Sequence, residues 1–188
     1  MGMAFKTTTD IYALRASNTL EIPAGSAGGA STTTIETNLD SLNREILLIW
    51  EVDFWTPTLG TQVGNVSSAA STESFVHSLQ INKASGFFSL SDVEHVASRT
   101  DQIIKAGANP QVIYIKDLRP DSKEFTSQTA QDSPLAIVVG DKIYFRQSHT
   151  NDLTTVTADT LVATCRMMVQ RAKADADTYA ALLQGYSL

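Results

Sequence analysis

Apolar and polar residues alternate along much of the chain, and this period-two spacing predicts strands. The clearest case is the stretch REILLIWEVDFWTPTLG at 44–60, which is the most apolar part of the sequence. A helix would place its carboxylates badly against so wide an apolar stripe. We therefore predict a long strand that ends at Pro57, because proline cannot donate a hydrogen bond to a neighbouring strand.

The two faces of this strand are predicted to have different neighbours. The even positions from Ile46 to Phe54 are all apolar, and we assign them to the core of the domain. The odd positions carry Leu47, Ile49 and Trp55, where a lone soluble domain would prefer polar side chains. We expect this second face to be covered by the helix-like excursion of the same chain at 89–107 or by a neighbouring subunit.

Other segments with alternating or β-branched sequences bring the predicted total to about eight strands. They are 17–23, 31–38, 73–84, 111–118, the two halves of 134–148 around a Gly-Asp turn, and 154–173. The last segment fits a helix face equally well, but its threonine-rich start favours a strand. Turn signals rather than regular crossover helices separate these segments, which indicates an antiparallel sandwich or barrel.

Two segments have helical features. The segment 89–107 offers Ser91 as a cap, with Glu94 three residues later, although it also fits two short pieces in a long excursion. The segment 175–188 is predicted to be a short C-terminal helix that Asp175 caps.

The chain is long enough for one good core, and the domain boundaries follow from the pattern. Residues 1–16 show little periodicity and are predicted to form an N-terminal arm. Residues 17–188 are predicted to form a single domain that includes the C-terminal helix.

Charge and sorting signals narrow the function. The formal net charge is −6, which argues against a general polyanion-binding protein. Residues 1–43 hold two cationic and four acidic residues, so the N-terminal region is no basic arm. We find no apolar core of signal-peptide length and no window near the ~18 apolar residues of a membrane span. A secreted or membrane-spanning protein is therefore not expected.

No motif in the sequence predicts catalysis, a cofactor or a metal site. The histidines His77, His95 and His149 lack the spacing of metal ligands on a helix. Glu51 and Asp53 share one strand face, which would suit a glycosidase, but we favour a solvated or subunit-facing pair. The protein is therefore predicted not to be an enzyme.

Two further predictions concern single side chains and charge. Cys165 is the only cysteine and sits among apolar residues, so we expect a buried, inert thiol. Cationic residues gather best near the C-terminus and give a modest candidate patch for nucleic acid. Its members are Arg146, Arg166, Arg171 and Lys173.

Three parts of the sequence together resemble a known family. They are EILLIWEVDFWTPT, SPLAIVVGDKIYFRQSHTND and LVATCRMMVQRAKAD, in that order. The most suggestive positions are Pro134, Gly140, Ile143, Tyr144, Phe145, Gln147, Thr150 and Asn151. The layout is similar to that of the small single-jelly-roll capsid proteins of small, often environmental, viruses, many of which have circular DNA genomes.

The resemblance implies an all-β fold, namely an eight-stranded antiparallel sandwich (a single jelly roll) with one or two short helices. It implies a coat protein of the virion that self-assembles in the host cell into an icosahedral shell around the genome, without catalytic residues or cofactors. The chain departs from many such proteins because it has no Arg/Lys-rich N-terminal arm.

Shell subunits need large interfaces, so apolar residues outside the core become candidate subunit contacts. The candidates are Leu47, Ile49, Trp55, Phe87, Phe88 and Tyr186. The alternative function is a carbohydrate-binding or receptor-binding β-sandwich of a viral or phage appendage, in which Trp55 and Tyr12 would be aromatic platforms for sugars. A β-sandwich hydrolase that uses Glu51 and Asp53 is a further, less favoured alternative.

Overall fold

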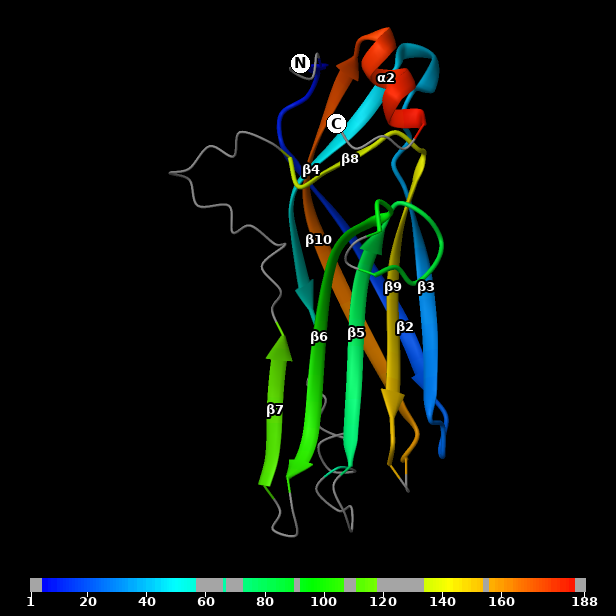
Figure 1. The fold of residues 1–188 in the computed structure, drawn as a ribbon, viewed down its shortest axis with the longest axis vertical. Helices are drawn as coiled ribbons and strands as arrows, with labels where there is room; N and C mark the ends of the chain where they lie inside the picture. The colour runs from blue at the N-terminus through cyan, green and yellow to red at the C-terminus, as the bar shows by residue number, and fades with distance from the viewer. Residues whose placement is uncertain are drawn as a thin grey trace.

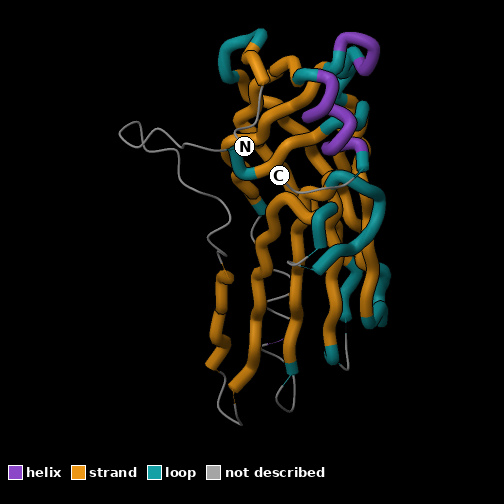
Figure 2. The backbone as a smooth tube through the Cα atoms, turned by 45° about the horizontal axis from the view of Figure 1, so that its top comes forward, coloured by secondary structure: helices purple, strands orange, loops and turns teal. Residues whose placement is uncertain are grey.

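Ten strands in two antiparallel sheets form a tall sandwich in the computed structural model, with the helical pieces at one end (Figures 1 and 2). The structure describes residues 5–56, 66, 73–89, 92–106, 111–117, 134–153 and 156–184. The strands are β1 (Phe5–Thr7), β2 (Tyr12–Ile22), β3 (Gly28–Glu36), β4 (Glu45–Trp55), β5 (Ser74–Asn82), β6 (His95–Ala106), β7 (Gln111–Asp117), β8 (Ala136–Val138), β9 (Lys142–Asn151) and β10 (Asp159–Ala174). The helices whose bounds lie within the described residues are the 3-10 helix η1 (Ser41–Asn43) and the α-helix α2 (Ala176–Leu183).

The strand order is that of a single jelly roll. In sheet A, β10 pairs with β1 and β2 on one side and with β4 on the other, and β4 pairs with β8. In sheet B the order is β3-β9-β5-β6-β7. The pairs β2–β10, β3–β9, β4–β8 and β5–β6 are those of one long hairpin wrapped into two sheets. This confirms the predicted fold, to which β1 and β7 add one edge strand each.

The predicted helical excursion at 89–107 is wrong over most of its length. Residues from His95 onward form β6, which pairs with β5 and β7. Ala97, Arg99, Asp101 and Ile103 alternate toward the interior and are all buried, so a period of two governs the segment. Pairing with the neighbouring strands β5 and β7 therefore overrides the local helix-capping signal. The predicted cap Ser91 lies outside the described residues.

Both strands predicted in 134–148 exist, but the Gly-Asp turn between them is not the hairpin turn that this dipeptide suggests. β8 belongs to sheet A and β9 to sheet B, so the turn between them crosses from one sheet to the other. Thr37 holds this turn. Its backbone N–H donates to the Asp141 carbonyl over 2.8 Å, and its hydroxyl donates to the Gly140 carbonyl over 3.0 Å. Gly140 does not adopt the positive φ that a hairpin turn would require.

A β-bulge in β4 changes which face of the strand points inward. Glu51 lies opposite Met168 and Ile49 lies opposite Val169, so Trp50 between them has no partner on β10. Before the bulge, the odd positions Leu47 and Ile49 point into the sandwich. After it, the inward positions are the even ones, beginning with Val52.

This bulge corrects the predicted faces of β4. Leu47 and Ile49 are 1% and 0% exposed and belong to the main core between the sheets, where they have no surface to offer a neighbouring subunit. Ile46 and Leu48 point to the outer side of sheet A instead and are equally buried. The sequence pattern remained apolar on both faces, and period two alone could not reveal the inserted residue.

The C-terminal helix covers the outer end of sheet A. Ile46, Leu48, Ala172 and Ala174 form a second, smaller core with Tyr179 of α2. Asp175 caps the helix as predicted, since its carboxylate accepts from the Thr178 N–H over 2.8 Å. The covering segment is α2 of the same chain, neither the expected excursion at 89–107 nor a neighbouring subunit, and it lies over the even positions.

The N-terminal residues join the same sheet. Phe5–Thr7 pair with Ala172–Ala174 of β10, and β2 already begins at Tyr12. The predicted boundary between residues 16 and 17 therefore falls inside β2.

Truncation of Ile49 tests its position in the protomer core. We expect Ile49→Ala to lower the free energy of unfolding of the monomer by about 2–5 kcal/mol, because it leaves a cavity between the sheets. Urea denaturation followed by tryptophan fluorescence measures this. The control is Leu42→Ala, since Leu42 is 94% exposed and should change stability by no more than about 0.5 kcal/mol. An Ile49→Ala monomer as stable as the control would contradict the assignment.

The thiol of Cys165 should be inert in the folded protein. Cys165 is fully buried between the sheets, and this burial raises the pKa of its thiol to about 12. Since the thiolate is the reactive form, we expect no labelling by a disulfide reagent at pH 8 in the native state and rapid labelling in guanidinium chloride. Stoichiometric labelling of the native protein at the rate of the unfolded chain would refute the buried position.

Candidate functional site

An arginine lies against an exposed tryptophan on the outer face of sheet A. The bulge at Trp50 directs Glu51, Asp53 and Trp55 outward, and Asp53 lies directly opposite Arg166 of β10. Arg166 Nε donates to Asp53 Oδ2 over 3.0 Å, and its guanidinium carbon lies 5.4 Å from the centre of the Trp55 ring. Trp55 nevertheless leaves 49% of its surface exposed.

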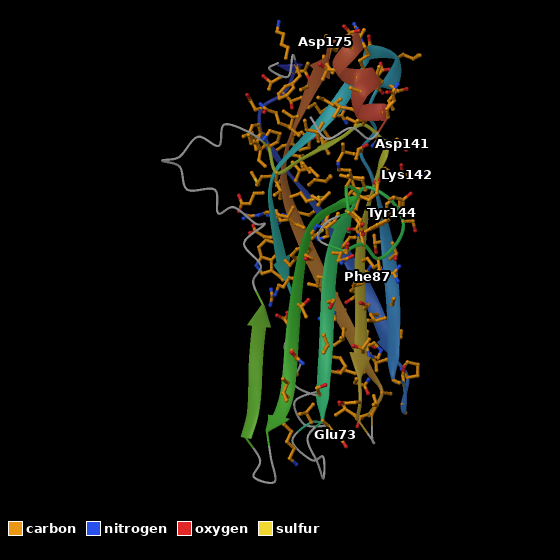
Figure 3. The ribbon with its side chains drawn as sticks, viewed as in Figure 1. Glu73, Phe87, Asp141, Lys142, Tyr144 and Asp175 are labelled. Atoms are coloured by element: carbon orange, nitrogen blue, oxygen red, sulfur yellow. The ribbon has the colours of Figure 1, made fainter. Side chains whose placement is uncertain are left out.

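Sheet B carries a similar pair on its own outer face. Phe87 lies in the segment that follows β5 (Figure 3), and the Arg146 guanidinium carbon lies 5.4 Å from its ring centre. The Gln80 side chain holds this segment in place. Its Nε2 donates to the Phe88 carbonyl over 2.9 Å, and its Oε1 accepts from the Phe88 N–H over 3.2 Å. Phe87 is 51% exposed, whereas Phe88 is half-buried.

The six predicted interface residues therefore separate into groups. Trp55 and Phe87 are exposed on opposite outer faces, Phe88 is half-buried, and Leu47 and Ile49 are interior. Tyr186 lies outside the described residues. Sequence reasoning missed five other exposed apolar residues, because nothing local distinguishes them from core positions. They are Ile11, Leu42, Val93, Val162 and Leu183.

The predicted cationic patch is not one surface. Arg146 belongs to sheet B, while Arg166, Arg171 and Lys173 belong to β10 of sheet A. Arg166 forms an ion pair with Asp53, and its Nη2 lies 3.8 Å from Glu51 Oε1. The two carboxylates considered for hydrolysis are therefore ion-pair partners of this arginine.

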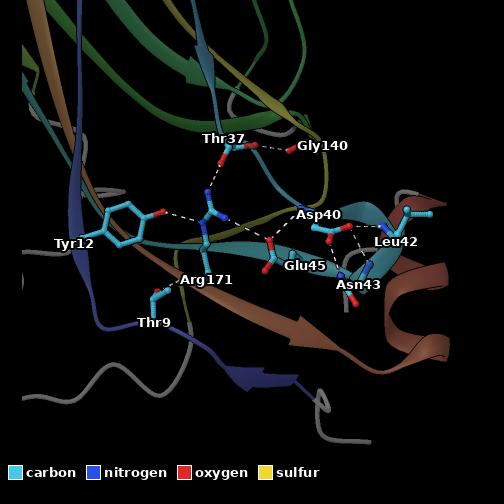
Figure 4. A network of polar contacts seen from close by, with 9 residues as sticks. All are labelled: Thr9, Tyr12, Thr37, Asp40, Leu42, Asn43, Glu45, Gly140 and Arg171. Carbon is cyan, nitrogen blue, oxygen red and sulfur yellow. Dashed lines mark hydrogen bonds and ion pairs between the residues drawn. The ribbon is translucent and has the colours of Figure 1, made fainter.

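Arg171 of β10 connects β2, β4 and the segment that follows β3 at the end of the sandwich (Figure 4). Its Nη2 donates to the Thr37 carbonyl over 2.8 Å, and its Nη1 lies 3.4 Å from Glu45 Oε2. Its Nε lies 3.4 Å from the Tyr12 hydroxyl. These contacts give Arg171 a structural role and reduce the positive charge it offers to a phosphate.

Lys173 gains a cationic neighbour that the sequence did not suggest. It is exposed on β10, and the exposed Lys6 of β1 lies opposite it in the sheet. Glu45 lies opposite Lys173 on the other side. The cross-strand pair Lys6 and Lys173 is the clearest cationic feature of this end of sheet A.

A chain of polar side chains crosses the interior between the sheets. Asn18 of β2 donates from Nδ2 to the Phe145 carbonyl over 2.9 Å. Gln147 of β9 donates from Nε2 to Asn18 Oδ1 over 3.0 Å and to the Leu161 carbonyl over 3.1 Å. Its Oε1 lies 3.1 Å from His77 Nε2. In the sequence, His77, Gln147 and His149 occupy the same strand faces as the inward apolar residues. This pattern is the signal from which the polar network could have been predicted.

Two absences apply to the part of the chain that the structure describes. Within it, no three histidine, cysteine or carboxylate side chains gather where they could hold a metal ion. No described helix combines the length and apolarity needed to span a lipid bilayer.

Comparison with known proteins shows a likeness of structure only. No protein-family model and no curated protein sequence matches the chain. Among solved structures, the chain is similar to the unassembled VP1 pentamer of Washington University polyomavirus, with 9% identity, a TM-score of 0.38 and coverage of 91% of this chain and 97% of that one. The chain is also similar to the unassembled VP1 pentamer of Merkel cell polyomavirus, with 8% identity, a TM-score of 0.40 and coverage of 92% of this chain and 99% of that one.

VP1 of the trichodysplasia spinulosa-associated polyomavirus gives 8% identity, a TM-score of 0.39 and coverage of 90% of this chain and 99% of that one. Other matched structures show VP1 in complex with glycans, such as the Merkel cell protein with the GD1a oligosaccharide. By its own strand order the chain is a single jelly roll, and the solved structures named above, to which it is similar, are polyomavirus VP1 proteins.

Proposed function

We propose that this protein is the coat subunit of a virus and that copies of it assemble into an icosahedral shell around the genome. One observation carries the proposal, namely a single jelly roll whose two outer faces each present an exposed aromatic residue next to an arginine. Jelly rolls are a recurrent architecture of viral coats. Aromatic and arginine side chains are enriched where proteins bind one another.

The positions of the two pairs support assembly rather than simple dimerisation. Trp55 lies on sheet A and Phe87 lies on sheet B, so the two patches face away from each other. A contact between unlike faces of neighbouring copies is heterologous, and such contacts build rings and closed shells. The proposed role is structural, and the proposed location is the virion.

The subunit contacts can be tested with Trp55→Ala and Phe87→Ala. We expect the subunit of each variant to fold normally and its association constant for assembly to fall at least about tenfold. Truncation of an aromatic hot spot at the centre of an interface costs about 2 kcal/mol or more of binding free energy. Size-exclusion chromatography and negative-stain imaging across salt and pH measure particle formation. Val162→Ala is the matched control, since Val162 is 45% exposed on β10 outside both pairs.

Two outcomes would count against this proposal. Wild-type protein that stays monomeric under all conditions would refute shell assembly. Particles formed equally well by all three variants would show that other surfaces make the contacts.

The carbohydrate-binding alternative has one observation in its favour. Trp55 exposes about half of its surface beside the carboxylates Glu51 and Asp53, and sugars are bound by aromatic rings flanked by acceptors. Glycan-array binding that Trp55→Ala abolishes, in a protein that forms no particles, would favour this function over the shell.

For the genome, we propose a weak contact through Lys173 and its cross-strand neighbour Lys6. Both are exposed, whereas Arg166 and Arg171 are bound to carboxylates of their own chain and Arg146 lies in the other sheet. The net charge of −6 limits any general attraction to a polyanion.

The salt dependence of binding tests this contact. If the two lysines each neutralise one phosphate, the slope of log affinity against log salt for a single-stranded oligonucleotide should be about −1.4. Fluorescence anisotropy at several salt concentrations gives the slope. The double variant Lys6→Gln, Lys173→Gln should bring it close to zero, while Arg146→Gln should leave it unchanged. A slope that the double variant does not alter would place the contact elsewhere.

A further inference from the structure

Two buried histidines lie next to each other between the sheets. His77 of β5 and His149 of β9 are directly opposite in the antiparallel ladder, and each is 1% exposed. The His149 ring stacks on Phe75, with 5.6 Å between ring centres and 13° between planes. On its other side, a Cβ built at Gly29 would lie 3.0 Å from His149 Nε2, so the ring packs closely against the backbone of β3.

The polar chain across the interior assigns the proton on His77. Asn18 Nδ2 donates to a carbonyl, so Asn18 Oδ1 accepts from Gln147 Nε2, and Gln147 Oε1 is left as an acceptor. His77 Nε2 must then be the donor in their 3.1 Å contact. The other ring nitrogen, Nδ1, is buried and has no hydrogen-bond partner among the described residues, so a second proton there would be left unsatisfied.

A second proton on His149 would also lack a suitable partner among the described residues. Its Nδ1 lies 3.5 Å from Asn151 Nδ2, an amide group that donates to the Ser26 carbonyl over 2.8 Å. Its Nε2 is buried with no partner. A doubly protonated ring would set one N–H against the amide N–H of Asn151 and leave the other N–H unsatisfied.

The charged groups that face this pair come from β6. Asp101 lies opposite His77 and favours a positive ring, but its carboxylate already binds Arg99 Nε over 3.1 Å and Arg99 Nη2 over 2.9 Å. Arg99 itself disfavours a positive ring. The other packed strands contribute neutral groups, namely Asn18 from β2, Gln147 from β9 and the Gly29 backbone from β3.

We propose that His77 and His149 form an acid-sensitive switch in the interior of the subunit, which is neutral and closed near pH 7 and forces the two sheets apart when both rings take up protons. Each added proton would place an uncompensated charge in a dry interior, and the two adjacent charges would repel each other. Burial accordingly lowers the pKa of both histidines below the ordinary value of 6.5. If the protein forms a shell, as the proposed function states, this switch would loosen the coat in acid.

The direction of the pH effect follows from proton linkage. Well above pH 6.5 both histidines are neutral in the folded and the unfolded chain, so the stabilising contribution is fully present. Below this value the unfolded chain binds protons that the folded chain excludes, and stability falls as the pH falls. Each histidine should lower the folding equilibrium constant by up to about tenfold per pH unit in this window.

The experiment uses the full chain as a monomer, so its result does not depend on whether shells form. We expect the folding equilibrium constant from urea denaturation to fall by at least about tenfold between pH 7.5 and pH 5 in the wild type. The double variant His77→Gln, His149→Gln cannot titrate and retains a donor toward Gln147, so most of this dependence should disappear. His95→Gln, which removes the third histidine, should keep it.

A measurement on the wild type covers the case in which the double variant does not fold. NMR titration of the histidine ring protons should place the midpoints of His77 and His149 below 6.5 in the folded protein. Midpoints at or above 6.5 would overturn the switch, and so would a folded double variant with the same pH dependence as the wild type. Particles that fail to form at any pH would refute the proposed function but not the switch.

Discussion

The inserted residue Trp50 in β4 is the constraint on which both hydrophobic cores depend. β10 is the central strand of sheet A, and β4 follows it along ten residue pairs. Without an insertion, one face of β4 would remain inside for its whole length. With it, Leu47, Ile49 and Val52 all reach the main core, while Ile46 and Leu48 form the second core under α2. The apolar residues on both faces of β4 before the bulge are therefore buried within one chain.

The bulge also connects packing to the proposed function. Because it shifts the alternation by one residue, Asp53 and Trp55 turn outward to meet Arg166, and an exposed aromatic residue results where the strand ends. Sheet B reaches a similar arrangement by another route, since Gln80 holds the segment that carries Phe87 near Arg146. The two faces are built independently, which suits a subunit that must meet different neighbours on its two sides.

The interior combines a dry apolar region with a directional polar chain. Asn18, Gln147 and His77 each use their hydrogen-bonding groups in one consistent direction, and this places a proton on Nε2 of the histidine. Such a chain gives specificity to the packing of two sheets that apolar contacts alone would hold less uniquely. The same arrangement has no acceptor for an additional proton, so stability near neutral pH and sensitivity to acid have one origin.

The amino-acid sequence alone determined most of the strand-forming segments, the buried Cys165 and the cap of the C-terminal helix, because these depend on period, burial and local hydrogen bonds. It suggested the jelly roll through resemblance. Only the tertiary structure decided that β6 is a strand, that β8 and β9 lie in different sheets, and that Leu47 and Ile49 point inward. It also brought His77 beside His149. Each of these depends on pairing between distant strands, and a single inserted residue reverses a face without changing the hydrophobic pattern that a sequence displays.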